Sequence, residues 1–319
     1  MKVVGVSRFG GPEALRVFEV REPHAGPGEV RIRVGAATVN PGDAVLRAGE
    51  LDLGASRPPY IPGMEAAGVV DEIGPGTVTG LRVGDAAMAF VMPLRPEGGA
   101  YSEFLVLPAD WVAPAPAGAG HAEAATLPMN GLTARLAVDV LGLSPGQVLA
   151  VTGAAGSVGG YAVQMAKADG LRVIADAAPA DAGLVRSLGA EVTVARGADV
   201  ADRFRQAAPD GVDGLVDAAV IGSARLAAAV RDGGGIAVVR GEGAQAADPG
   251  ELARRQVAYH PVWVPQYLGD QARLDRLRAQ AEDGTLTLRV AGRFPAEEAA
   301  AAHRMLAAGG IRGRLVLVF

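Results

Sequence analysis

Gly153, Gly156 and Gly159 are the residues of this sequence best suited to chemistry, because they stand three apart between an apolar run and a helical pattern. A strand that enters a helix through glycines leaves backbone N–H groups open at the positive end of the helix dipole. Such donors suit a pyrophosphate and indicate dinucleotide binding. The spacing Ala154-x-Gly156-x-x-Gly159 has alanine where the first glycine of the usual fingerprint stands. An ordinary glycine-rich turn is the alternative.

The flanking elements predict a βαβ unit that positions these glycines. Residues 148–151 form a short apolar run, typical of a strand buried on both faces. Helical spacing begins at Gly160, and Gly170 stands where a helix C-cap glycine is expected. Residues 171–175 predict a second strand. The complete unit favours dinucleotide binding over an ordinary turn.

The strand–helix alternation continues after this unit, through an apolar strand at 215–221 and a strand at 236–239. Gly233–Gly235 predicts a turn between them. This order predicts a doubly wound parallel sheet, with ligands beyond the carboxyl ends of its strands. Residues 257–264 predict an edge strand, a natural place for two-fold pairing, and we expect a homodimer.

The first 112 residues or so predict a β-rich domain, because strands such as 30–34 and 99–107 are short and closely punctuated by turns. The Pro/Gly-rich segment 113–120 marks a boundary. After residue 264 the pattern is again similar to that of the β-rich first domain, with a strand predicted at 286–290 and a helix at 295–308. We expect three segments: 1–118 as the first part of a catalytic domain, 119–264 as the dinucleotide-binding domain, and 265–319 as a return to the catalytic domain.

The composition of the 319 residues excludes several classes of function. Half are hydrophobic, one fifth are charged, and the net charge of -5 argues against a nucleic-acid surface. No apolar stretch is long enough for a bilayer, and no secretory signal stands at the start, so we expect a cytoplasmic protein without membrane contact. The sequence has no cysteine, which excludes disulfides, thiol catalysis and Cys-ligated metals. The four histidines are too far apart for a metal motif.

Several phrases together resemble the zinc-independent quinone oxidoreductase branch of the medium-chain dehydrogenase/reductase family. They follow the family's order over nearly the whole chain: Phe9–Leu15, Val39–Asp43, Ile61–Gly68, Val83–Asp85, Gly99–Glu103, Asn130–Ala134, Ala154–Gly159 and Gly310–Arg314. The resemblance implies an α/β protein with a GroES-like β-rich catalytic domain, a Rossmann domain with a doubly wound parallel sheet, and a cleft between them.

The same resemblance bears on zinc. Zinc-dependent relatives carry cysteine and histidine at positions that match Asn40 and Met64 here. An amide and a thioether make a poor Zn²⁺ site, so we expect no metal. Without a Lewis acid, direct alcohol oxidation is disfavoured, and hydride transfer to an electron-poor acceptor remains feasible.

The resemblance also assigns roles to side chains. Asn40 matches the family's active-site asparagine, whose amide would bond the substrate oxygen or the nicotinamide ribose; the alternative is an Asn-Pro-Gly turn. Thr133 would lie against the cofactor, or make only a local helix bond. Tyr60 would be a pocket aromatic or proton donor, or simply pack, and solvent is another proton source. Asp43 would cap the following helix. The remaining cofactor-binding residues that we assign are Gly153, Ala154, Ala155, Gly156, Ser157, Val158, Gly159, Ala218, Ala219, Val220, Val262 and Val264.

Two residues point to different cofactors. Asp176, at the end of the second strand, would bond both ribose hydroxyls and repel a 2′-phosphate, which favours NADH. Arg196, after the third strand, would bind that phosphate. Each has a plain alternative, a helix N-cap for Asp176 and a solvated loop charge for Arg196. Family habit favours NADPH, with NADH as the alternative.

These observations lead to an enzyme that uses NADPH to reduce a small electrophile, either a quinone or an α,β-unsaturated carbonyl. One alternative is an enoyl-thioester reductase of polyketide or fatty-acid metabolism. Another is a dinucleotide-binding protein with little turnover and a structural, crystallin-like role. The glycine loop supports binding equally in all three, so the enzymatic hypothesis depends largely on the resemblance.

Overall fold

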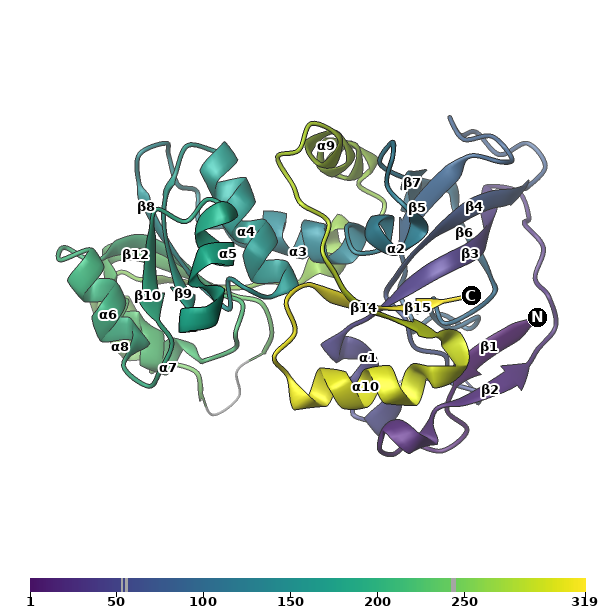
Figure 1. The fold of residues 1–319 in the computed structure, drawn as a ribbon, viewed down its shortest axis with the longest axis horizontal. Helices are drawn as coiled ribbons and strands as arrows, with labels where there is room; N and C mark the ends of the chain where they lie inside the picture. Colours follow the sequence, from purple (N-terminus) through teal and green to yellow (C-terminus); the bar gives the residue numbers. More distant parts are fainter. Residues whose placement is uncertain (53, 55–56, 242–244) are drawn as a thin grey trace. The chain divides into compact units, whose positions relative to one another are not determined.

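The computed structural model describes residues 1–52, 54, 57–241 and 245–319 and divides the chain into two compact units (Figure 1). Unit 1 comprises Met1–Met129, Tyr267–Asp283 and Leu288–Phe319. Unit 2 comprises Asn130–Gln266 and Gly284–Thr287. The end of the chain therefore folds with its beginning. No helix within the described residues is both long and apolar enough to cross a membrane.

Unit 2 contains a parallel sheet of six strands in the order β10-β9-β8-β11-β12-β13. Its strands are β8 (Val148–Thr152), β9 (Arg172–Ala177), β10 (Val192–Ala195), β11 (Val212–Asp217), β12 (Val230–Val238) and β13 (Ala258–Pro261). The helices of this part of the chain are α3 (Pro128–Asp139), α4 (Ser157–Ala168), α5 (Ala182–Ser187), α6 (Val200–Ala207), α7 (Ser223–Leu226) and α8 (Pro249–Arg254). The strand order reverses between β8 and β11, which confirms the doubly wound Rossmann arrangement.

Unit 1 is built on a largely antiparallel sheet in the order β14-β15-β3-β4-β5-β7, with β6 paired to β3. Its strands are β1 (Lys2–Gly5), β2 (Arg16–Glu19), β3 (Glu29–Val39), β4 (Glu65–Ile73), β5 (Ala86–Phe90), β6 (Phe104–Pro108), β7 (Val112–Pro114), β14 (Val290–Pro295) and β15 (Arg314–Val318). Its helices are α1 (Pro41–Ala48), α2 (His121–Ala124), α9 (Gln271–Glu282) and α10 (Ala299–Ala308). Figure 1 shows the yellow C-terminal elements lying with the purple N-terminal ones, because β15 pairs with β3.

The two cores follow the apolar patterns of the sequence. In β3, Val30, Ile32 and Val34 are buried in the core of unit 1, while the arginines between them point away from it. In unit 2, the buried strands β8 and β11 pack with helix α6 through residues such as Leu215 and Phe204. Period-two alternation therefore marks a half-buried sheet, and continuous apolar runs mark a sheet covered on both faces.

Several local predictions were wrong. The strands predicted at 99–107, 215–221 and 257–264 are Phe104–Pro108, Val212–Asp217 and Ala258–Pro261 in the structure. The predicted turn at Gly233–Gly235 is part of strand β12, where the register against β11 shifts. A Cβ at Gly234 would lie 2.7 Å from the backbone oxygen of Asp213, so these glycines permit a bulge with close backbone approach. The strand predicted at 286–290 begins only at Val290, because Thr287 instead donates its backbone N–H to Gln164 of α4 at 2.8 Å.

Candidate functional site

The glycine loop of unit 2 connects β8 to α4 with the tight geometry that a phosphate-binding turn requires. Gly153 has a φ of 64°, which favours glycine, and its oxygen accepts a hydrogen bond from the Gly156 nitrogen at 2.9 Å. A Cβ at Gly159 would lie 2.4 Å from the oxygen of Gly153. Ala154 is buried, and its φ is not positive, so its backbone conformation does not require glycine. The alanine is therefore accommodated at the place where the usual fingerprint has glycine.

Helix α4 begins with its backbone donors available to an anion. Its N-cap is Gly156, with no side-chain cap, and the first turn carries no acidic residue. The N–H groups of Ser157, Val158 and Gly159 have no intrahelical partner, by the geometry of any helix start. Together with the helix dipole, these groups fit a pyrophosphate. Gly170 ends the helix with a φ of 79°, which confirms the predicted cap.

Gly159→Ala is expected to destabilise the protein by about 1–3 kcal/mol, because the added methyl group must displace the backbone of Gly153. Urea denaturation measures the loss. Gly183→Ala is the matched control: Gly183 lies in α5 with no atom near its missing Cβ, and alanine there is expected to be neutral or stabilising by a few tenths of a kcal/mol. An equal effect of the two substitutions would contradict the close packing at Gly159.

Asp176 and Arg196, whose expected roles favour different cofactors, form an ion pair in the structure. Arg196 Nε lies 3.6 Å from Asp176 Oδ2, and Asp176 Oδ1 accepts the backbone N–H of Gly153 at 2.7 Å. The side chain of Asp176 is 2% exposed, whereas that of Arg196 is 49% exposed. Burial raises the pKa of Asp176, while Arg196 and the backbone N–H groups of the loop act in the opposite direction. The carboxylate thus supports the glycine loop, and the guanidinium is the more accessible group.

The residues after β11 come close to the glycine loop. Ala218 and Ala219 lie near Gly153, whose missing Cβ would be 3.1 Å from the Ala219 nitrogen. Asp217 fixes this stretch, because its carboxylate accepts the Thr152 hydroxyl at 2.6 Å and the Gly222 N–H at 2.9 Å. Val220 has a φ of 54°, unusual for a β-branched residue. We take this strained position as a candidate functional feature.

The remaining cofactor candidates of unit 2 are buried at other places in the fold. Thr133 lies in α3. Val262 continues the pairing of β13, since its nitrogen donates to the Val238 oxygen at 2.8 Å. Val264 begins a short 3₁₀ helix, Val264–Tyr267. Val262 and Val264 therefore follow the carboxyl end of the edge strand.

In unit 1, Asn40 lies in a buried polar network. Its amide Nδ2 donates to Thr38 Oγ1 at 2.9 Å and lies 3.4 Å from Glu65 Oε1. The Thr38 hydroxyl donates to the same Glu65 oxygen at 2.5 Å, and Met129 N donates to the other oxygen at 2.8 Å. The network fixes the orientation of the Asn40 amide and satisfies the buried carboxylate.

Glu65, Thr38 and Asp217 are functional residues that the sequence motifs do not indicate. Glu65 and Asp217 each carried a signal, since an acidic residue within an apolar strand must find partners when it is buried. Thr38 carried none, because threonine is common in strands.

Tyr60 has different surroundings. Its ring stacks on that of Phe9, with the centroids 4.9 Å apart and the planes 18° from parallel. Its backbone pairs with Val6 in both directions at 2.9 Å. Tyr60 is half-buried, and Phe9 is exposed. The pair therefore presents a partly accessible aromatic surface.

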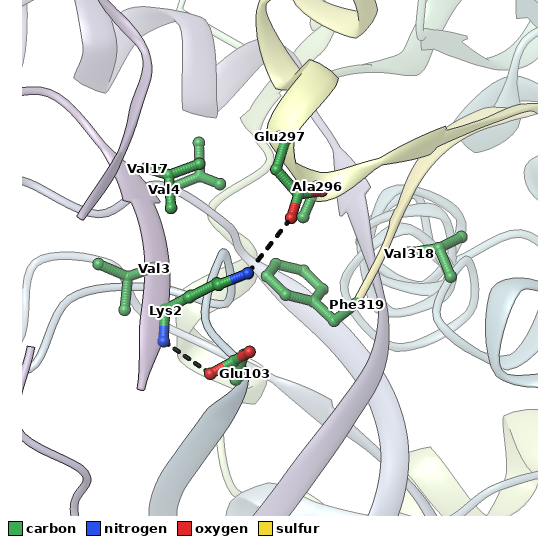
Figure 2. Close-up of a pocket in the computed structure, with 9 residues that line it drawn as sticks. All are labelled: Lys2, Val3, Val4, Val17, Glu103, Ala296, Glu297, Val318 and Phe319. Atoms are coloured by element: carbon green, nitrogen blue, oxygen red, sulfur yellow. Dashed lines mark hydrogen bonds and ion pairs between the residues drawn. The ribbon is translucent and has the colours of Figure 1, made fainter. Parts of the chain in front are cut away.

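A separate small pocket of about 70 Å³ lies in unit 1 where the two ends of the chain meet (Figure 2). Lys2 spans it, with its Nζ 3.9 Å from Glu297 and its backbone N–H donated to Glu103 at 2.6 Å. Phe319 and valines of β1, β2 and β15 line the rest. None of the predicted site residues lines this pocket, so we assign it no role in the chemistry.

Comparison with known proteins supports the fold and identifies the family. Residues 26–117 match the alcohol dehydrogenase GroES-like domain, and residues 188–317 match the zinc-binding dehydrogenase family. The 2-haloacrylate reductase of Burkholderia sp is 30% identical, covering 98% of this chain and 97% of that protein. The quinone oxidoreductase of Rattus norvegicus is 27% identical, covering 100% and 98%. The synaptic vesicle membrane protein VAT-1 homolog-like of Homo sapiens is 34% identical, but the match covers 52% of this chain and only 38% of that relative.

Solved structures give the same fold over the full length of the chain. An NAD-dependent alcohol dehydrogenase aligns with a TM-score of 0.90 and 30% identity, covering 100% of both chains. A mycobacterial protein complexed with NADPH aligns with a TM-score of 0.88 and 28% identity, again covering 100% of both. The chain therefore belongs to the medium-chain dehydrogenase/reductase family of oxidoreductases, among relatives of the quinone oxidoreductase branch.

Proposed function

We propose that this oxidoreductase uses NADPH, requires no zinc, and reduces a quinone or an α,β-unsaturated carbonyl. NADPH supplies the hydride when it is bound. The glycine loop and the start of α4 would hold its pyrophosphate, and Thr133, Ala218–Val220, Val262 and Val264 would contact the rest of the cofactor. Arg196, exposed beside Asp176, would bind the 2′-phosphate.

The donor chemistry around Asn40 is the observation that carries this proposal. Asn40 and Met64 occupy the positions that match zinc ligands in zinc-dependent relatives. The Asn40 Nδ2 donates to Thr38, and an amide nitrogen has no lone pair for a metal. A thioether is a poor partner for Zn²⁺ as well. Since no Lewis acid would lower the pKa of an alcohol, the acceptor must already be electron-poor. The similarity to 2-haloacrylate reductase and quinone oxidoreductase supports the same class of acceptor.

Within this proposal, the amide of Asn40 binds the acceptor oxygen or the nicotinamide ribose, and an Nδ2 bond to the acceptor oxygen would replace the long 3.4 Å bond to Glu65. Tyr60 contacts the acceptor with its ring or donates a proton from its hydroxyl, and solvent is the other proton source. The half-buried ring of Tyr60, stacked on Phe9, supports contact with a flat acceptor.

The purified protein should oxidise NADPH when 1,4-benzoquinone or a simple enone is added, measured as loss of the reduced-nicotinamide absorbance. NADH and a crotonyl thioester are the parallel arms of the experiment. Turnover with NADH alone would refute the cofactor assignment, and turnover with the thioester alone would favour the enoyl-thioester alternative. Tight binding of NADPH without turnover of any acceptor would favour the non-catalytic alternative. An unchanged rate after exhaustive dialysis against a chelator is expected, since no zinc is required.

We also propose a homodimer formed through the edge strand β13. Its outer side pairs with no strand among the described residues, and Trp263, just beyond it, is 67% exposed. Sedimentation equilibrium is expected to give twice the chain mass of 32.3 kDa. Trp263→Lys is expected to favour the monomer, while Val78→Lys, another exposed apolar position but in unit 1, should leave the mass unchanged.

We further propose the domain bounds and the cytoplasmic location that the sequence indicates. Residues 1–118 and 265–319 would form the catalytic domain and residues 119–264 the cofactor domain. Limited proteolysis with and without NADPH tests the boundaries, because a bound cofactor should protect sites within 119–264. Cell fractionation tests the cytoplasmic location.

A further inference from the structure

A chain of buried polar side chains joins α1 to α10 inside unit 1. Tyr101 OH lies 3.3 Å from Asp43 Oδ2 and 3.1 Å from His303 Nε2. Arg47 lies 3.4 Å from the other ring nitrogen of His303. Asp43, Tyr101 and His303 are all buried. The contact between Arg47 and His303 links residues that are 256 positions apart in the sequence, so only the tertiary fold creates this series of polar contacts.

The chemistry of these groups fixes the direction of the hydrogen bonds. A guanidinium has only donors, so Arg47 donates and His303 Nδ1 accepts. Burial, with the nearby charge of Arg47, lowers the pKa of His303 to about 3, and the ring is neutral near pH 7. The ring proton then resides on Nε2 and is donated to the Tyr101 oxygen, while the Tyr101 hydroxyl donates to Asp43. When Asp43 is ionised, every donor of this series of hydrogen bonds therefore points toward its carboxylate.

Asp43 in turn holds two backbone segments together. Its Oδ2 accepts the N–H of Asn40 at 2.7 Å, and its Oδ1 accepts the N–H of Gly63 at 2.8 Å. The first segment carries Asn40 itself, and the second leads into β4, which begins with Glu65. Asn40 Nδ2 and Glu65 Oε1 are 3.4 Å apart. The bridge through Asp43 therefore sets the distance between the two segments whose side chains meet in the Asn40 network.

We propose that Asp43 is a positioning residue for the Asn40 amide, and that Tyr101, His303 and Arg47 hold its carboxylate in place. The capping role expected from the sequence is one half of this arrangement, and the bridge to Gly63 is the other. The proposal rests on the proposed function, in which Asn40 binds the acceptor or the ribose. Asp43 itself touches neither and acts through Asn40.

The test is a double-mutant cycle on kcat/KM with NADPH and benzoquinone. Asp43→Asn keeps the size of the side chain but replaces one of its two acceptor atoms by a donor, so one backbone bond is lost. The expected loss in kcat/KM is about 10- to 100-fold, as for a misplaced polar group at a reacting centre. In an Asn40→Ala background the same change is expected to cost less than about 3-fold, because the group that it positions is gone. Equal losses in both backgrounds would overturn the proposal.

Two further variants make the cycle specific. Asp270→Asn is the matched control, because Asp270 is another carboxylate of unit 1 at a helix start, where it accepts the Arg273 N–H at 3.0 Å. It should leave kcat/KM unchanged. Tyr101→Phe removes one donor to Asp43 but leaves both backbone bonds, so it should give a smaller loss with the same dependence on Asn40. If Asp43→Asn does not fold, Tyr101→Phe takes its place in the double-mutant cycle with Asn40→Ala.

Hydrogen exchange separates failure of this proposal from failure of the proposed function. In the Asp43→Asn protein, exchange at one of the two amides, that of Asn40 or that of Gly63, should become at least about 10-fold faster, as expected for loss of a hydrogen bond of ordinary strength. Amides of β8 should not change. This result holds even if the wild-type protein reduces no acceptor, which would refute only the function. Unchanged exchange at both amides would overturn the positioning role.

Discussion

His303→Gln is expected to lower the free energy of unfolding, relative to the wild type, by about 3 kcal/mol more at pH 6.5 than at pH 4, whereas Asp43→Asn is expected to lower it more at pH 4. The two substitutions thus give pH dependences of opposite sign. The combined variant is expected to keep the pH dependence of the wild type in this range, because the two opposing slopes are removed together. Urea denaturation at a series of pH values measures all four proteins.

The signs follow from two opposite pKa shifts. Burial raises the pKa of Asp43 from an ordinary 3.8 to about 7, even though Asn40, Gly63 and Tyr101 donate to it. Its contribution to stability is present in full below pH 3.8 and is lost as the pH rises toward 7. Burial lowers the pKa of His303 from 6.5 to about 3. Its contribution is present above pH 6.5 and is lost as the pH falls toward 3, so the two slopes oppose each other between about pH 4 and 6.5.

Each single variant exposes the slope of the partner that remains. One pKa unit corresponds to about 1.4 kcal/mol, and the shared window spans between two and three units. If both single variants kept the pH dependence of the wild type, Asp43 and His303 would not be buried in the ionisation states described. If only one of the two single variants differed from the wild type in its pH dependence, the pKa shift would lie on the residue replaced in that variant alone.

Arg196→Gln is expected to weaken NADPH binding by about 10- to 100-fold and to leave NADH binding nearly unchanged. The guanidinium would lose its charge-assisted bonds to the 2′-phosphate, each worth about 1.5–3 kcal/mol. The loss would also remove the cation beside Asp176, whose carboxylate then repels that phosphate. Titration of the nicotinamide fluorescence with both cofactors measures the two dissociation constants.

Two controls define the outcome at Arg196. Arg172→Gln removes an exposed arginine at the opposite end of β9, where it pairs with Glu191, and should change neither constant. Asp176→Asn keeps an oxygen for the Gly153 N–H and should not weaken NADPH binding. Weaker NADH binding in Asp176→Asn, with NADPH unaffected by Arg196→Gln, would reverse the proposed roles of the two residues.

Much of the fold could be predicted from local sequence. The alternation in 30–34 and the continuous apolar run at 148–151 each indicated the kind of sheet that the strand joins, because side chains in a strand alternate between two faces. Glycine at 170 indicated the end of α4. The turn predicted at Gly233–Gly235 was wrong, because glycine permits both a turn and a bulge. The choice between them depends on the strand that lies alongside.

The site was predictable only where one backbone segment forms it. The glycine loop is local, so the spacing of its glycines is enough to indicate its shape. Asp176 and Arg196 each had a clear electrostatic role when considered alone, and those roles conflicted. The structure makes them partners at 3.6 Å, with the carboxylate buried against the loop and the guanidinium exposed.

The sequence by itself determined the order of strands and helices, the family, and the absence of cysteine ligands, because these properties depend on residue type and on spacing along the chain. The tertiary structure decided which buried charges meet. Asp43 joins Tyr101 and His303, and Glu65 joins Asn40 and Thr38, across separations that no local pattern encodes. A buried ionisable group takes its protonation state from the groups packed around it, and only the fold determines those neighbours.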